Sequence, residues 1–120
     1  MKFKGKEIRV ILSENAHKQY IKLNRFAKQE SENSVHHSLL KSVERVIEML
    51  KKDPFKGEQI RKKMMPKSYI RKYGIDNLWR IELSNYWRML YTIKGGSIEI
   101  INFILDIVDH KKYNKIFGYN

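Results

Sequence analysis

LWRIELSNYWRMLYTI, residues 78–93, is the most informative part of the sequence for the fold, because two kinds of side chain alternate along it. Aromatic and aliphatic residues occupy every second position on both sides of the polar pair Ser84–Asn85, and the positions between them include Arg80, Glu82 and Arg88. Such alternation around a polar turn, with many aromatic and β-branched residues, is typical of two antiparallel strands. We therefore predict a β-hairpin with one apolar face and one charged face.

The length of the hairpin loop determines which side chains share a face. A two-residue loop pairs Ile81 with Arg88 and so places a cation among the apolar side chains. A three-residue loop, residues 84–86, pairs Ile81 with Met89 and sets Glu82 opposite Arg88. Because a shift of one residue moves every side chain to the other face, we expect the three-residue loop, with its middle residue in the left-handed conformation.

The composition limits the fold and the partners. A chain of 120 residues is expected to form a single domain, residues 1–120. It has 25 Lys and Arg against 13 Asp and Glu, a formal net charge of +12, which favours nucleic acid or an acidic protein segment as partner over a membrane surface. The absence of cysteine excludes disulfides and thiolate metal sites. The charged N-terminus lacks the apolar run of a signal peptide, so we expect a cytoplasmic protein without a membrane span.

The remaining elements predict the fold class. Lys6–Leu12 alternates like a strand, Ser13 stands at the N-cap of a helix with apolar spacing to Ala27, and a second helix spans about Ser34–Lys52. Ile98–Val108 is apolar at nearly every position, as in a central strand, and the two helices supply the crossover for a parallel pairing with the first strand. We therefore predict an α+β fold of order β-α-α-β-β-β, with two N-terminal helices packed on one face of a mostly antiparallel sheet.

The loop before Ile98–Val108 decides which of its side chains join the charged face. A three-residue loop, residues 94–96, pairs Arg88 with Asn102 and keeps Asn102 and Asp106 out of the core, whereas a four-residue loop reverses the faces. We prefer the shorter loop for that reason. The polar side chains expected on the charged face are Arg80, Glu82, Arg88, Asn102, Asp106 and His110.

Residues 51–72 carry much of the positive charge: nine Lys or Arg minus two acidic residues gives seven of the net twelve charges. We predict a short edge strand at Ile60–Met65 and a helical turn at Tyr69–Tyr73 that Gly74 closes. Such a run is most often a solvated face, but here it precedes a hairpin that exposes arginines, which favours a continuous basic surface. The candidate RNA-binding residues are Arg61, Lys62, Lys63, Lys67, Arg71 and Lys72.

Three segments in this order, YWRMLYTIKGG (86–96), IEIINFILDIVDH (98–110) and HKKYNKIFGY (110–119), resemble the RelE/ParE superfamily of toxins from toxin–antitoxin systems. The resemblance runs from about Ile8 to Tyr119 and implies a cognate antitoxin as partner, in a toxin–antitoxin hetero-oligomer. RelE-like members are endoribonucleases that cut mRNA in the ribosome without metal or cofactor, whereas ParE-like members inhibit DNA gyrase. We favour the RelE-like branch, with ribosome and mRNA as partners.

The resemblance also implies catalytic roles. Arg88 matches the arginine that follows the hairpin turn and would hold the scissile phosphate. Arg80 falls where the family often has a basic residue on the preceding strand. Glu82 falls where some members have a lysine, so the general base is expected to be Glu82 or His110.

Tyr113, in preference to Tyr119, matches the C-terminal tyrosine that contacts the substrate in the family. Each candidate also has a structural alternative: Glu82 and Arg88 as a surface ion pair, His110 as the cap of a strand, and Tyr113 as part of an apolar latch. The alternative functions are a gyrase inhibitor and a non-toxic basic module that binds nucleic acid. A gyrase inhibitor needs no titratable set, which favours the endoribonuclease.

Overall fold

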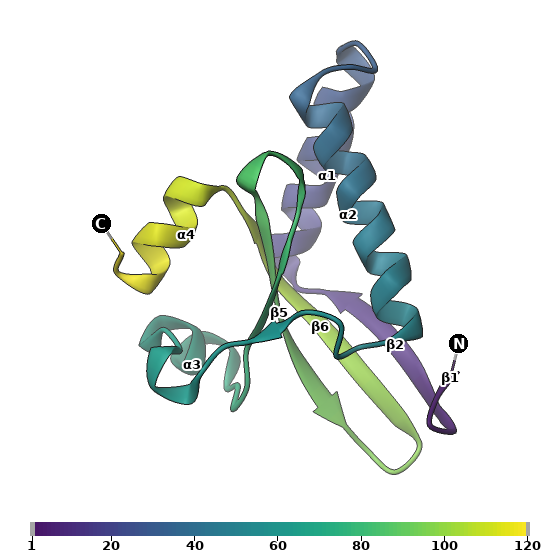
Figure 1. Cartoon of the computed structure of the whole chain (residues 1–120), viewed down its shortest axis with the longest axis vertical. Coiled ribbons are helices and arrows are strands. Elements are labelled where there is room, and N and C mark those ends of the chain that lie inside the picture. Colours follow the sequence, from purple (N-terminus) through teal and green to yellow (C-terminus); the bar gives the residue numbers. More distant parts are fainter. Residues whose placement is uncertain (1, 120) are drawn as a thin grey trace.

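The computed structural model describes residues 2–119 and contains a six-stranded sheet in the order β1-β2-β6-β5-β4-β3 (Figure 1). The strands are β1 (Lys2–Phe3), β2 (Lys6–Leu12), β3 (Glu58–Gln59), β4 (Trp79–Glu82), β5 (Arg88–Gly95) and β6 (Glu99–Val108). The helices are α1 (Glu14–Gln29), α2 (Val35–Lys52), α3 (Lys67–Tyr73) and α4 (His110–Phe117). β2 and β6 are parallel and the other strand pairs are antiparallel, so the predicted α+β fold is confirmed.

Serine side chains begin both long helices, and the sequence predicted the first of these caps. Ser13 Oγ accepts a hydrogen bond from the N–H of Ala16 at 3.0 Å, and Ser34 Oγ accepts one from the N–H of His37 at 3.1 Å. These bonds satisfy donors that the first helical turn leaves without a partner. Ser13 Oγ also donates to the carbonyl of Leu105 at 2.7 Å, which ties the start of α1 to the central strand β6.

The predicted register of the β4–β5 hairpin is confirmed. Ile81 pairs with Met89, and Glu82 pairs with Arg88. A backbone hydrogen bond of 2.8 Å joins the residues on either side of the three-residue loop. Asn85, in the middle of the loop, has φ 57° and ψ 36°, a left-handed conformation that asparagine adopts more readily than most residues.

The predicted register of the β5–β6 hairpin is wrong, because Arg88 pairs with Val108 and not with Asn102. The turn comes later than expected, and the N–H of Gly96 donates to the carbonyl of Glu99 at 2.8 Å. Two of the three residues predicted as loop therefore belong to β5. Near this turn the side chain of Asn102 consequently lies on the face that we expected to be apolar.

A β-bulge in β6 determines which of its side chains face the long helices. Leu105 is the extra residue, because Tyr91 pairs with Ile104 and the preceding residue of β5 pairs with Asp106. Ile104 and Ile107 consequently both pack in the core beneath α1 and α2, although a regular strand would point them to opposite faces. The bulge thus changes the alternation halfway along the strand.

Asn102 and Asp106, which we expected outside the core, are buried. Asn102 Nδ2 donates to a backbone carbonyl just after α2 at 3.3 Å. The Asp106 carboxylate accepts hydrogen bonds from Asn15 at 2.6 Å, Gln19 at 3.0 Å and the Tyr69 hydroxyl at 2.6 Å. Because these bonds replace lost contacts with water, Asp106 can remain inside the protein, where it joins α1 and α3 to the sheet.

The second face of the sheet, on which we predicted the charged side chains, is also covered. A second core cluster lies beneath α3 and α4 and consists of Met65, Tyr69, Ile75, Leu78, Leu90, Leu105, Val108 and Tyr113. The predicted strand at Ile60–Met65 is wrong, since the edge strand is β3 and Lys62–Met64 form a 3₁₀ turn. α3 ends at Gly74 with φ 61°, as expected. Among the described residues, the helices are all too short or too polar to cross a lipid bilayer.

Candidate active site

The side chain of Arg88 lies between Glu82 and His110. Its Nε donates to Glu82 Oε1 at 3.2 Å, and its Nη1 lies 3.1 Å from His110 Nδ1. Because a guanidinium has only donors, Nδ1 is the acceptor in this contact. The Arg88 side chain is 15% exposed and the Glu82 side chain is 65% exposed, so the arginine lies at the boundary between the core and the surface. The geometry therefore joins a carboxylate, a cation and an imidazole at one end of the sheet.

Tyr113 lies against both candidate arginines. The carboxylate of Asp109 caps α4 by accepting from the N–H of Lys112 at 2.7 Å, and the helix then turns Tyr113 inward, where it is 3% exposed. The Arg88 guanidinium carbon is 4.4 Å from the centre of the tyrosine ring, and that of Arg80 is 5.7 Å away. At these distances the ring attracts both cations, so it holds the two arginines side by side.

Arg80 donates hydrogen bonds to the Tyr113 hydroxyl and, at 2.8 Å, to Glu58 Oε1. Burial by itself lowers the pKa of Arg80, but the hydrogen bonds to Tyr113 and Glu58 outweigh burial and raise the pKa above its ordinary value. Our sequence reasoning missed Glu58, because residues 51–72 were treated as a basic run. The contact follows from the pairing of β3 with β4, which sets Glu58 opposite Arg80.

Gly57 allows β3 to approach the site. A Cβ atom at this position would lie 2.6 Å from the carbonyl oxygen of Arg80 and would also clash with the hydroxyl of Tyr91. The N–H of Gly57 donates to that hydroxyl at 2.9 Å. A residue with a side chain would therefore push Glu58 away from Arg80.

Tyr86, at the tip of the β4–β5 hairpin, is a further residue that the sequence reasoning did not select. It is 76% exposed, and its φ of 62° is unusual for a bulky side chain. Its ring lies 6.5 Å from the imidazole of His110. The position of Tyr86 as the third residue of the predicted loop could have indicated its role, since an exposed aromatic side chain there lies beside the charged face.

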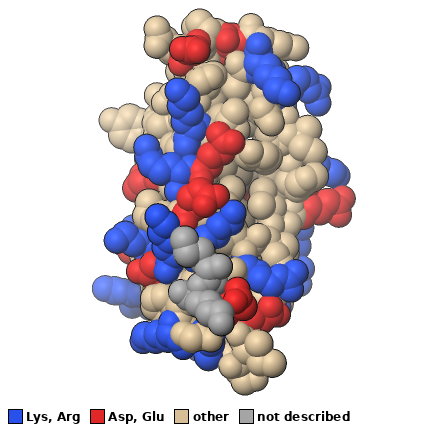
Figure 2. Space-filling view, turned by 90° about the vertical axis from the view of Figure 1, so that its right-hand side faces the viewer, with Lys and Arg blue, Asp and Glu red and all other residues tan. Residues whose placement is uncertain are grey.

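The six candidate RNA-binding residues are exposed but do not gather at one place. Arg61 borders a depression that also contains Arg80, whereas Lys72 lines a hollow beside the start of α1. Within residues 2–119 none of the six forms a salt bridge. On the side of the molecule that carries α2, Lys and Arg are interspersed with Asp and Glu (Figure 2), so positive charge there is partly balanced.

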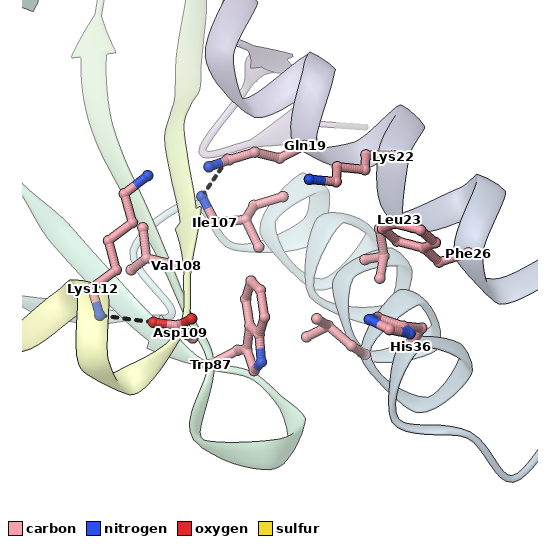
Figure 3. A pocket seen from close by; sticks show the side chains of 11 residues that line it. Gln19, Lys22, Leu23, Phe26, His36, Trp87, Ile107, Val108, Asp109 and Lys112 are labelled. Carbon is pink, nitrogen blue, oxygen red and sulfur yellow. Dashed lines mark hydrogen bonds between the residues drawn. The ribbon is translucent and has the colours of Figure 1, made fainter.

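A groove of about 310 Å³ separates the long helices from the start of α4 (Figure 3). Trp87 stands in its centre, facing Leu23 and Phe26 of α1. Lys22 and Lys112 approach the groove from opposite sides. Trp87 and Arg88 are adjacent in sequence, so their side chains point to opposite faces of the hairpin. A ligand in this groove would therefore lie close to the arginine site but contact the other face.

The comparison with solved structures finds a YoeB/ParE toxin from Agrobacterium tumefaciens with a TM-score of 0.58 and 13% sequence identity. The match covers 85% of this chain and 98% of that toxin. The sequence comparisons find no matching protein-family model and no matching curated protein. At this identity the likeness concerns the arrangement of helices and strands, and the chemistry of the site has to be argued from the residues present.

Proposed function

We propose that this chain, which has the fold of the RelE/ParE superfamily of toxins, is a toxin that cleaves mRNA in translating ribosomes. The observation that supports this proposal most directly is the contact of Arg88 with Glu82 and His110, at 3.2 Å and 3.1 Å. An inhibitor that only binds gyrase has no need of an arginine flanked by two groups that exchange protons. The site therefore favours cleavage over inhibition by binding.

The proposed reaction uses the RNA's own 2′-hydroxyl as nucleophile. A base removes the hydroxyl proton, the 2′-oxygen forms a bond to the adjacent phosphorus, and the bond from phosphorus to the 5′-oxygen breaks. An acid gives a proton to the leaving 5′-oxygen, so the products are a 2′,3′-cyclic phosphate and a 5′-hydroxyl end. Cations on the non-bridging oxygens lower the barrier because they stabilise the charge that develops there.

The residues of the site match these requirements. Arg88 and Arg80 are the cations, and the fork of a guanidinium suits two phosphate oxygens. Glu82 and His110 flank Arg88 and supply the base and the acid. The ring of Tyr113 holds the two arginines at the spacing that the structure records. Substrate must displace the contacts of Arg88 with Glu82 and His110, which frees those two groups for proton transfer.

The proposal includes the partners and the compartment. Ribosome and mRNA are anionic, and a net charge of +12 attracts such partners over long distances. The activity requires the cytoplasm, where translation takes place. An acidic antitoxin would neutralise the toxin in a hetero-oligomer, and the groove between Lys22 and Lys112, with Trp87 in its centre, offers such a protein an apolar contact between two cations.

The decisive experiment is induced expression followed by mapping of mRNA ends. Wild-type protein should stop translation and leave cuts within translated mRNA. Arg88→Ala should lower the cleavage rate by about a hundredfold or more, the loss typical when a group that stabilises transition-state charge is removed. Arg45→Ala, at an exposed position on α2, is the matched control and should cleave like the wild type.

Uncut mRNA under induction of the wild type would contradict the proposal, and blocked DNA supercoiling by the purified protein would replace it with gyrase inhibition. If cuts appear, the pH dependence of cleavage on purified ribosomal complexes shows which of Glu82 and His110 is the general base and which is the general acid. The variant without the general base, Glu82→Gln or His110→Gln, should lose the rising arm of the pH–rate profile, and the other variant should lose the falling arm.

A further inference from the structure

The imidazole of His110 makes a contact at each of its two ring nitrogens. Nδ1 lies 3.1 Å from Nη1 of Arg88 on β5, and Nε2 lies 3.3 Å from Nδ2 of Asn114 on α4. His110 and Asn114 are four residues apart in the same helix, so their side chains project from one face of it. The ring is therefore held between a cation of the sheet and an amide of its own helix.

The contact at Nε2 limits the rotation of an exposed ring. His110 is the first residue of α4 and lies at the surface, with the ring of Tyr86 at 6.5 Å and tilted by 61°. An imidazole turns readily about its χ2 bond, and a half turn exchanges Nδ1 with a carbon atom. A ligand that takes Arg88 away from Nδ1 leaves Asn114 as the hydrogen-bonding group that fixes the orientation of the ring.

An amide suits a histidine that gains and loses protons. It has an oxygen that accepts and a nitrogen that donates, and a half turn about its terminal bond exchanges the two atoms. Its oxygen can accept the N–H of Nε2 whether Nδ1 is free or protonated, and the amide itself does not titrate. Asn114 can thus hold the ring at Nε2 while a proton moves to or from Nδ1.

We propose that His110 transfers its proton through Nδ1 and that Asn114 is the positioning residue that holds the ring by Nε2. The inference rests on the proposed function, in which an RNA phosphate draws Arg88 away from His110. Nδ1 is the nitrogen that faces Arg88 in the free protein, so it is also the one that faces the bound phosphate. A neutral ring takes the 2′-hydroxyl proton at Nδ1, or a charged ring gives a proton from Nδ1 to the leaving 5′-oxygen. In both roles Nε2 keeps its proton.

Asn114→Leu tests the inference, because leucine has a similar shape and no hydrogen-bonding atom. The cap that ends α4 uses the backbone carbonyl of Asn114 and not its side chain, so the variant should fold like the wild type. On purified ribosomal complexes its cleavage rate constant should fall by about tenfold to a hundredfold, the loss expected from a misplaced catalytic group. The toxin concentration at half-saturation should stay the same, since Asn114 does not hold the phosphate.

Asn24→Leu is the matched control for the loss of the amide. Asn24 is a half-buried helical asparagine like Asn114, but it lies on α1 and forms no side-chain hydrogen bond within residues 2–119. This variant should cleave at the wild-type rate. Circular dichroism and urea midpoints of both leucine variants show that each is folded.

Asn114→Asp gives a readout that a purely structural contact would not change. The carboxylate keeps an oxygen for Nε2 and adds a negative charge that stabilises the charged imidazole. The variant should retain most of the cleavage rate, and the arm of the pH–rate profile that His110→Gln removes should move to higher pH. The other arm should stay in place. The other charged groups near His110, which the variant leaves unchanged, are Glu82, Arg88, Asp109 and Lys111.

Nitrogen-15 NMR of histidine-labelled protein locates the ring proton without any cleavage. The neutral ring of His110 in the wild type should carry its proton on Nε2, and Asn114→Leu should give a mixture of both forms. A neutral wild-type ring with its proton on Nδ1 overturns the inference. It is also overturned if Asn114→Leu cleaves at the wild-type rate, or if Asn114→Asp leaves both arms of the profile in place.

Mapping of mRNA ends separates these outcomes from failure of the proposed function. Cuts by the wild type together with any of the three contrary results retain the nuclease and remove the role of Asn114. A wild type that leaves translated mRNA intact contradicts the proposed function itself, and the inference about proton transfer falls with it.

Discussion

The two sides of the sheet are covered in different ways. On one side, α1 and α2, with 16 and 18 residues, cover an apolar cluster that includes Leu39, Val43 and Leu50. On the other side, α3 and α4, with 7 and 8 residues, cover a smaller cluster in which the hydroxyls of Tyr69 and Tyr113 bind charged side chains. Burial of apolar side chains stabilises the folded state by itself, whereas each buried polar group needs a hydrogen-bond partner.

The two sides therefore differ in what they contribute to stability and to function. The first side is expected to supply most of the free energy of folding, since its helices are long and its cluster is apolar. The second side holds the candidate active site, and its short elements depend on a few hydrogen bonds. Elements of that kind open at a lower free energy than the core, which suits a surface that has to admit a ligand.

The largest effect on stability is expected from Leu39→Ala on the first side. Leu39 is 1% exposed, so the change removes buried methyl groups and leaves a cavity, at a cost of about 2–5 kcal/mol in the free energy of unfolding. Urea denaturation followed by circular dichroism measures the loss. Val35→Ala, at an exposed position in the same helix, is the control and should change the free energy by less than about 0.5 kcal/mol. Equal stabilities for the two variants would contradict the assignment of the core to this side.

A smaller and more local effect is expected from Tyr69→Phe on the second side. The change removes the hydroxyl that donates to the buried carboxylate of Asp106 at 2.6 Å, a hydrogen bond to a charged group worth about 1.5–3 kcal/mol. Hydrogen exchange should accelerate in α3 and remain unchanged in α2. Tyr73→Phe, in the same helix but without a side-chain hydrogen bond among the described residues, should leave exchange as in the wild type. Faster exchange throughout the protein would mean that the two sides open together.

The smallest effect near neutral pH concerns Tyr91, which lies in the first core. Burial raises its pKa to about 12, the carboxylate of Asp53 adds to the shift, and the hydrogen bond from Gly57 opposes it. Because the pKa is higher in the folded state, this contribution to stability is complete below about pH 10, the ordinary range for tyrosine, and is lost as the pH rises toward 12.

Urea midpoints measured from neutral pH to above pH 10 test this expectation. The midpoint of the wild type should fall more steeply above pH 10 than that of Tyr91→Phe, which lacks the ionisable group. Burial and the contact with Asp106 also raise the pKa of Tyr69, so Tyr69→Phe should flatten the curve in the same direction. Parallel curves for wild type and both variants would show that neither buried hydroxyl contributes.

The features that sequence reasoning predicted correctly depend on neighbours along the chain. Alternation and loop length alone pair Ile81 with Met89 and Glu82 with Arg88, because any other register places a cation against the core. Ser13 caps α1 for an equally local reason. The contact between Glu82 and Arg88 was therefore predictable, and so was the order of the main elements.

The features that it missed depend on segments that meet only in the folded protein. Both alternating sets of β6 are apolar, so the sequence predicts a central strand but not its register. The bulge at Leu105 sets which residues face each side. The positions of Glu58 against Arg80 and of Tyr113 against both arginines were likewise set by tertiary packing, of β3 on β4 and of α4 on the second face. Local alternation sets the register of neighbouring strands where one alternating set is polar, as in the β4–β5 hairpin. Contacts between distant segments depend instead on which surfaces are left to bury once those strands have formed.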